Sequence, residues 1–284
     1  MITDFSRCRD SGKFYTGAER KKGILIKGEN YIIKFRKRSQ KGLTYNHVSE
    51  YLGCHIFEQA GMSTQETWLG TYRGEDVVVM KDFTSESEMF VPFNDVGDSS
   101  LDVDKERYQY SYTDIMEMLE ANRKLTCVEE TIDTFWDMFI MDAFLGNFDR
   151  HGSNWGFLKC GNRYRMAPVF DNGSCLFPKL ITDEQCREVL DSEEEMEKRV
   201  YQFPTSQIQL HGRKSSYYDV ITSHEFAACD RALCRMAGKI NRERIGKLID
   251  EIPCMSEVRK DFLKRMLRLR YDKLLKEPLE GVRV

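Results

Sequence analysis

Two short polar segments, close together in the sequence, constrain the fold of this chain more than any other feature. The first, Gly146-Asn-Phe-Asp-Arg-His-Gly-Ser-Asn154, directly follows a long apolar helical pattern over residues 127–145. The second is the turn Asp171-Asn-Gly173. The stretches between them, Trp155–Leu158 and Tyr164–Ala167, have the pattern of short strands. The order of helix, polar loop, two strands and turn is a more specific signal than either polar segment alone.

Asp149, Asn154 and Asp171 are the chemically informative side chains of these segments. Phosphoryl transfer from ATP uses a carboxylate beside the attacking hydroxyl, an amide that binds one Mg²⁺, and a second carboxylate for the metal that bridges the phosphates. The catalytic loop of protein kinases has the same step from Asp to Asn. A backbone-satisfying turn around Asn147 and a simple hairpin turn at residues 171–173 are the alternatives. The order of elements favours Asp149 as the catalytic carboxylate and Asn154 and Asp171 as metal ligands.

His151, Lys34 and Glu50 are weaker candidates, each with a common structural alternative. His151, close to Asp149, would stabilise the transferred phosphate or position the loop, although a lone histidine is more often structural. Lys34, on a predicted strand, would neutralise the nonbridging phosphate oxygens, whereas the alternative is a solvated strand lysine. Glu50, on the next predicted helix, would hold Lys34, whereas the alternative is an ordinary exposed helix position.

The first part of the chain predicts a small, mostly antiparallel sheet with one helix. Alternating apolar residues on either side of tight turns predict two hairpins, over residues 23–35 and 67–81. Residues 46–60 have helical apolar spacing, with Asn46 as the candidate N-cap. A glycine-punctuated basic segment, residues 12–23, precedes the first hairpin. Its backbone N–H groups would cradle phosphates, or it is simply a flexible loop.

The rest of the chain predicts mostly helices. Residues 85–107 are polar and acidic without a clear period, and they predict a loop. Helical patterns follow over residues 113–124 and 127–145, and they resume over most of residues 183–276.

Composition narrows the class of protein. The net charge of −3 gives no reason to expect nucleic acid as a partner. No stretch is long and apolar enough to predict a membrane span, and residues 1–14 lack the apolar core of a Sec-type signal. The nine cysteines show no C-x-x-C spacing, which favours free thiols in a reducing compartment. We therefore expect a cytoplasmic protein.

Longer stretches of the sequence resemble the HipA-like serine/threonine kinases. The resemblance includes the loop 146–154 and Ala167-Pro-Val-Phe-Asp171, and stretches of this length are far more specific than a three-residue motif. It continues through Tyr31–Phe35, Ser49–Ile56, Glu66–Tyr72, Lys81–Thr84, Phe135–Phe139, Asn154–Leu158 and Gly173–Leu176. Residues 85–125 match less clearly. The chain is too short for the extra N-terminal subdomain of full-length HipA, which argues against an antitoxin–DNA assembly.

The resemblance implies an α+β, two-lobed protein-kinase-like fold. A small antiparallel β-rich N-lobe, residues 1–84, would carry the ATP-binding sheet and helix. A larger, mostly helical C-lobe, residues 85–284, would carry the catalytic loop, the metal site and a helical bundle. The cofactors implied are ATP and Mg²⁺.

The resemblance also assigns roles to residues of this sequence. By match, Lys34 would contact the ATP phosphates and pair with Glu50. Gly17 and Ala18 resemble the Gly-Ala step of the HipA phosphate loop. The hinge that contacts adenine would be formed by Lys81, Asp82 and Phe83.

We therefore predict an ATP- and Mg²⁺-dependent serine/threonine protein kinase. A phosphoinositide-type lipid kinase, whose catalytic loop has the same D-R-H-x-x-N pattern, is one alternative. From Ser174 to Pro204, however, eight acidic residues outnumber four basic ones, which argues against an anionic headgroup. A pseudokinase or nucleotide-gated binding module is the other alternative, and it would require the loss of a catalytic residue, of which none is missing.

The expected partner is a protein with a Ser or Thr acceptor, and the enzyme is expected to phosphorylate itself. Candidate acceptors in loops are Ser11, Thr16, Ser174, Thr205 and Ser206. We favour residues 11–16, where a phosphate would pair with Arg20, Lys21 or Lys22. The physiological substrate, the oligomeric state, an effector or toxin role, and export without a Sec-type signal all stay open.

Overall fold

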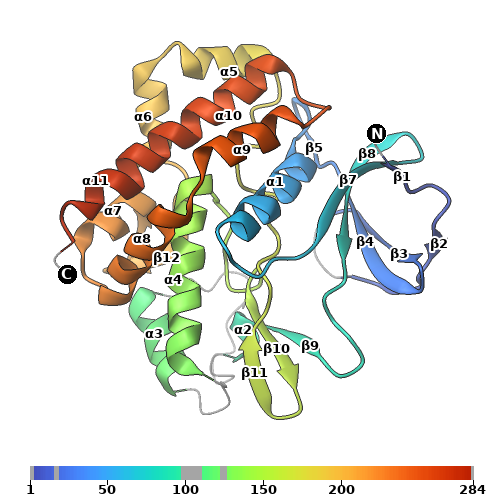
Figure 1. Ribbon diagram of the computed structural model, residues 1–284, viewed down its shortest axis with the longest axis horizontal. Coiled ribbons are helices and arrows are strands. Elements are labelled where there is room, and N and C mark those ends of the chain that lie inside the picture. The colour runs from blue at the N-terminus through green and yellow to red at the C-terminus, as the bar shows by residue number, and fades with distance from the viewer. Residues whose placement is uncertain (1–2, 16–18, 97–110, 122–126, 283–284) are drawn as a thin grey trace.

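A six-stranded, curved sheet with one long helix beside it forms the N-terminal part of the chain (Figure 1). In the computed structural model, which describes residues 3–15, 19–96, 111–121 and 127–282, the strand order is β1-β7-β8-β4-β3-β2. Neighbouring strands are antiparallel, except that the short β1 runs parallel to β7. The strands are β1 Thr3–Asp4, β2 Arg9–Asp10, β3 Lys21–Ile26, β4 Glu29–Phe35, β7 Thr67–Tyr72 and β8 Glu75–Lys81.

The two predicted hairpins, β3–β4 and β7–β8, are confirmed, and their alternating apolar residues build a small core of their own. This core is made by Phe5, Ile24, Ile33, Phe35, Tyr72, Val77 and Val79. The short strands β5 (Arg38–Ser39) and β6 (Gly42–Leu43) pair with each other and lead into α1 (Asn46–Gln59). Helix α1 packs against β7 and β8, while its apolar face joins a second, larger core. It therefore links the sheet to the helical part.

Helix α4 (Val128–Leu145) is the central element of that helical part (Figure 1). Its last turns are almost fully buried, and it contacts α3, α8, α10 and the π-helical segment η1. The surrounding helices are α2 Phe93–Val96, α3 Tyr112–Ala121, α5 Asp183–Leu190, α6 Glu193–Tyr201, α7 Tyr217–Ser223, α8 Ala227–Lys239, α9 Arg242–Asp250, α10 Glu257–Arg270, η1 Tyr271–Lys276 and α11 Glu277–Leu279.

Two small sheets complete the architecture. β10 (Gly156–Cys160) pairs with both β9 (Met89–Pro92) and β11 (Arg163–Met166), and β12 (Thr205–Leu210) pairs with β13 (Arg213–Ser216). The strand after β8 thus pairs with β10, in the later part of the chain, and not with the six-stranded sheet. This pairing is compatible with a lobe boundary at residues 84 and 85, which stays a proposal.

Most predicted elements are confirmed, including α1, α3, α4, β10 and β11. The prediction of an irregular loop over residues 85–107 is wrong for residues 89–96, because β9 exists only through its pairing with β10. Residues 97–107 lie outside the described part of the chain. The hairpin β12–β13 was missed because its strands are short and polar. None of the helices in the described ranges is both long and apolar enough to cross a membrane.

The predicted N-cap role of Asn46 is also wrong. Tyr45 occupies the N-cap position of α1, and no side chain caps this helix. The Asn46 side chain instead donates to the Phe35 carbonyl at 3.1 Å and accepts from the Lys37 N–H at 2.9 Å. Asn46 therefore fixes the start of α1 against the end of β4, the strand that carries Lys34.

Candidate active site

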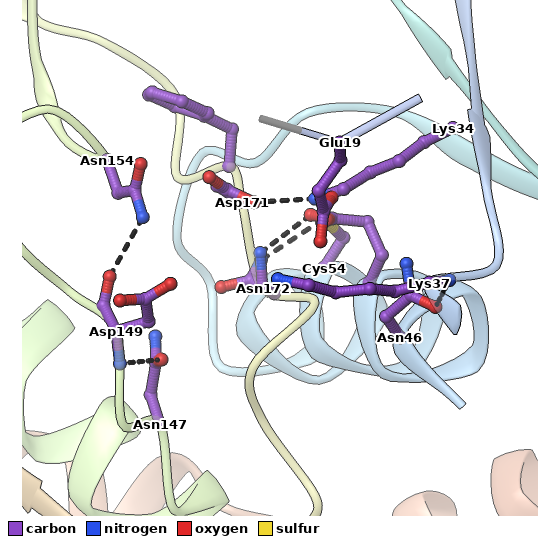
Figure 2. Close-up of polar contacts among 12 residues, drawn as sticks. Glu19, Lys34, Lys37, Asn46, Cys54, Asn147, Asp149, Asn154, Asp171 and Asn172 are labelled. Carbon is purple, nitrogen blue, oxygen red and sulfur yellow. Dashed lines mark hydrogen bonds and ion pairs between the residues drawn. The ribbon is translucent and has the colours of Figure 1, made fainter. Parts of the chain in front are cut away.

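The ammonium group of Lys34 is the centre of a buried cluster of charges where the sheet, α1 and the Asp171 turn meet (Figure 2). Its Nζ lies 2.8 Å from Glu50 Oε2 and 2.6 Å from Asp171 Oδ1. Glu19 Oε2 is a third partner at 2.8 Å. The lysine side chain is only 3% exposed, and Glu50 is fully buried. The structure thus pairs Lys34 with Glu50, as the resemblance implies, and adds Asp171 and Glu19 as further partners.

The ion pairs of this cluster keep Lys34 and Asp171 charged. Burial alone would lower the pKa of Lys34, but the carboxylates of Glu50 and Asp171 outweigh it and raise that pKa. Burial would likewise raise the pKa of Asp171, but Lys34 outweighs it and lowers the pKa to about 2. Both side chains are therefore ionised at neutral pH.

The turn at residues 171–173 is held tightly against α1. The Asn172 N–H donates to Glu50 Oε1 at 2.6 Å, and the Asn172 side chain donates to Cys54 Sγ at 3.2 Å. A Cβ on Gly53 would lie 2.5 Å from Asn172 Cβ, and one on Gly173 would lie 3.3 Å from Lys34 Nζ. Glycine at these two positions permits the close approach of helix, turn and lysine.

Asp149 lies in the loop after α4, and its half-exposed carboxylate faces the space between this loop and the Asp171 turn, here called the cleft (Figure 2). Its N–H donates to Asn147 Oδ1 at 3.0 Å, and its carbonyl accepts from Asn154 Nδ2 at 2.8 Å. His151 Nε2 is 4.0 Å from Asp149 Oδ1. The Asn147 side chain thus stabilises the turn, as the alternative interpretation of this loop requires. The Asp149 carboxylate is not used for this purpose.

Arg150 is the important residue that the sequence reasoning missed. Its guanidinium is buried and forms a bidentate ion pair with Asp142 of α4, at 2.8 and 3.0 Å. It also donates to the carbonyls of Asn154 and Phe170 and to Asn172 Oδ1. Arg150 therefore joins the Asp149 loop to the Asp171 turn. Its position between Asp149 and His151 was the only sequence signal.

The charge around Asp149 differs from what the acidic segment suggested. Burial, the largest effect, raises the pKa of Asp149, and the Asp171 carboxylate also raises it. His151, Lys37 and Lys179 lower this pKa, but the net result is a raised pKa. Among the groups with the largest effect on this pKa, the one from residues 174–204 is Lys179, a cation. The acidic residues of that segment lie on or directly beside α5 and α6. The acidic count of the segment thus leaves out this lysine near Asp149.

Several backbone groups of the predicted hinge, residues 81–83, form hydrogen bonds within the protein. The Lys81 N–H donates to the Glu66 carbonyl, the Lys81 carbonyl accepts from the Gln65 side chain, and the Asp82 N–H donates to the Asn30 carbonyl. Phe83 lies beside the cleft, where its ring contacts Phe90 and Phe170 at 5.9 and 5.4 Å between ring centres. The Asp82 carbonyl and the Phe83 N–H have no hydrogen-bond partner among the described residues. They are the hinge groups that could form hydrogen bonds with adenine.

The basic segment before β3 reaches this hinge. Lys13 Nζ lies 2.6 Å from Asp82 Oδ2, and the Tyr15 hydroxyl donates to the same oxygen at 2.8 Å. Gly17 and Ala18, the candidate phosphate loop, lie outside the described residues, as does Thr16.

The residues present fit a magnesium site. The Asn154 amide donates through Nδ2, which leaves Oδ1 as an acceptor, and Asp171 binds Lys34 through Oδ1 only. Among the described residues, no three His, Cys, Asp or Glu side chains gather into a site that could hold a metal. An amide oxygen and a carboxylate oxygen are suitable ligands for Mg²⁺, which binds one or two protein oxygens together with water and phosphates.

Comparisons with known proteins point to the same family. The family model of the HipA-like C-terminal domain matches residues 14–255. The serine/threonine-protein kinase CtkA of Helicobacter pylori is 36% identical to this chain over an alignment of 286 positions. The alignment includes 96% of this chain and 86% of the relative. The crystal structure of the H. pylori proinflammatory kinase CtkA matches with a TM-score of 0.89 at 33% identity, covering 99% of this chain and 98% of that one.

HipA of Shewanella oneidensis MR-1, solved with HipB and its operator DNA, matches with a TM-score of 0.60. It is 14% identical and covers 98% of this chain and 68% of that one, so this likeness concerns the fold alone. The predicted α+β, kinase-like fold is thereby confirmed. Because the family model spans most of the sequence, the chain belongs to the HipA-like C-terminal domain family.

Proposed function

We propose that this protein is an ATP- and Mg²⁺-dependent serine/threonine protein kinase that phosphorylates a protein substrate and itself. The observation that carries the proposal is the buried Lys34 ammonium held between Glu50 and Asp171. A buried ion pair contributes little net stability, so packing does not explain a lysine in this position. A lysine that binds the phosphates of ATP does explain it. The 36% identity to a serine/threonine-protein kinase over most of both chains supports the kinase class.

The chemistry follows from the groups around the cleft. The acceptor hydroxyl oxygen forms a bond to the γ-phosphorus of ATP, the bond to the β–γ bridging oxygen breaks, and ADP leaves. Asp149 orients the hydroxyl and accepts its proton, and His151 positions the loop. Lys34 offsets charge on the phosphates, while Glu50 fixes its position. Asn154 and Asp171 would hold Mg²⁺, which neutralises phosphate charge when bound.

The direct test is incubation with γ-labelled ATP and Mg²⁺, in parallel with a protein acceptor and with phosphoinositide vesicles. We expect label on protein serine or threonine, and loss of that label when EDTA removes the metal. Label on the lipid alone would identify a lipid kinase. Absence of transfer to either acceptor, with ATP still bound, would identify a pseudokinase.

Replacement of Lys34 by Met is expected to abolish the stabilisation of the protein by Mg²⁺-ATP. In the wild type, a hundredfold excess of ligand over its Kd raises the free energy of unfolding by about 2.7 kcal/mol. A thermal shift assay should show several degrees for the wild type and little for K34M. The variant will also melt lower without ligand, because Glu50 and Asp171 lose their partner. An unchanged ATP response in K34M would contradict the assignment.

Autophosphorylation is expected in residues 11–16. Ser11 accepts from the Lys13 N–H at 3.2 Å, and its Oγ would lie 2.3 Å from a Cβ on Gly23. A phosphate on Ser11 therefore cannot be accommodated against β3, and this segment would have to leave the hinge. Mass spectrometry after incubation with Mg²⁺-ATP locates the phosphate, with Asp149→Asn as the inactive control. Phosphate confined to other loops would contradict the predicted site.

A further inference from the structure

Two lysines near Asp149 are not used by the proposed mechanism. Lys37 follows β4, and Figure 2 shows its side chain pointing into the cleft toward Asn172. Lys179 lies on the segment that follows the Asp171 turn. Both side chains are exposed. Both ammonium groups lower the pKa of Asp149, so they lie close enough to its carboxylate for a Coulomb interaction. Among the described residues, neither ammonium has a carboxylate at ion-pairing distance.

The residue before Asp149 is aromatic, and a second aromatic ring stacks on it. Phe148 directly precedes Asp149, and Lys179 Nζ lies 4.3 Å from the centre of its ring. The ring of Phe203 stacks on Phe148, with 6.1 Å between ring centres and an interplanar angle of 26°. Phe203 is 47% exposed, which places it among the few large apolar side chains at the described surface. One exposed phenylalanine alone is unremarkable, but this one stacks on the ring of the residue next to Asp149.

We propose that Lys37, Phe148, Lys179 and Phe203 form the acceptor-binding surface. This surface selects a serine or threonine that has an acidic residue and a large apolar residue close to it in sequence. The inference rests on the proposed kinase function and deepens it by naming the class of substrate. Unpaired cations beside the catalytic base attract an anion, and the stacked rings offer apolar contact.

The spacing of the groups limits the substrate motif. Side chains on an extended peptide alternate in direction, and each residue advances about 3.3 Å. Because Lys179 lies directly over the ring of Phe148, its anionic partner and the apolar side chain enter within a few ångströms of each other. Both residues are therefore expected within about two positions of the acceptor hydroxyl.

The test uses synthetic peptides with one serine, a leucine, and either Asp or its neutral isostere Asn at each of two positions on either side. For the wild type, kcat/KM should be about two- to fivefold higher for the best Asp peptide than for its Asn counterpart, as for one partly screened ion pair. In Lys179→Met this ratio should fall to about one. In Phe203→Ala, kcat/KM should fall for leucine peptides relative to their glycine counterparts.

Lys159→Met is the matched control. Lys159 also lies over an aromatic ring, that of Tyr164 at 5.7 Å, but it is on β10 and is absent from the groups that act on Asp149. Its Asp/Asn ratio should equal that of the wild type. A raised KM for ATP in Lys179→Met, with the ratio unchanged, would overturn the proposal and assign this lysine to the nucleotide.

The remaining outcomes separate the two levels of inference. If the wild type labels itself but transfers equally to Asp and Asn peptides, or to no peptide, the acceptor-surface proposal is wrong and the kinase function stands. If label appears only on phosphoinositide vesicles, the two lysines bind a headgroup and the protein-kinase proposal itself fails.

Discussion

Asp149→Asn should lower the rate of phosphoryl transfer by about 10² to 10⁴, the usual contribution of a positioned proton acceptor. The substitution keeps the size of the side chain and removes the carboxylate. Asp149 is half-exposed, and its carboxylate has no hydrogen bond to the protein among the described residues. The melting temperature of the variant should therefore stay close to that of the wild type, so that lost activity reports on chemistry.

Single-turnover kinetics with saturating Mg²⁺-ATP separates this loss from a binding defect. The variant should still be stabilised by Mg²⁺-ATP, because Lys34 and Asp171 remain in place. Asp250→Asn, which changes only an exposed ion pair with Lys264, serves as the control and should keep full activity. Full turnover by a folded Asp149→Asn protein would remove Asp149 from the catalytic role.

The sequence could predict the parts of this site that lie within one short segment. Asp149 and Asn154 belong to a single loop, so their spacing alone carries information about their relative position. The hairpins were predictable for the same reason, because alternation and turn residues are local signals. Lys34 and Glu50 could be suggested, but only a resemblance to relatives raised them above the common structural alternatives.

Contacts across long sequence separations could not be predicted. Lys34 and Asp171 meet over a separation of 137 residues, and nothing in the local pattern identified Glu19 as a further partner of this lysine. The acidic content of residues 174–204 gave no indication of Lys179 for the same reason. Composition counts charges but does not say which of them face Asp149, and the structure places Lys179 there.

Arg150→Met is expected to be the most destabilising single change near the site. Arg150 is 5% exposed and Asp142 is 1% exposed, so the substitution leaves a buried, unpaired carboxylate. Removing one partner of such a pair costs about 3–5 kcal/mol. For a protein of this size, the melting temperature should fall on the order of 10 °C. A variant that melts within two degrees of the wild type, as roughly expected for an exposed pair, would contradict this view.

A second pair of variants tests whether the cost comes from the stranded carboxylate. In the double variant Arg150→Met/Asp142→Asn, the buried charge is gone, so the loss should be smaller than the sum of the two single losses. Arg150→Lys keeps the positive charge but loses the bidentate hydrogen bonds to Asp142. Its melting temperature should lie between those of the wild type and R150M. Because Arg150 also binds the carbonyls of Asn154 and Phe170, R150K should lower kcat more than its small loss of stability explains. Such a split would identify Arg150 as the residue that positions the catalytic loop and the Asp171 turn relative to each other.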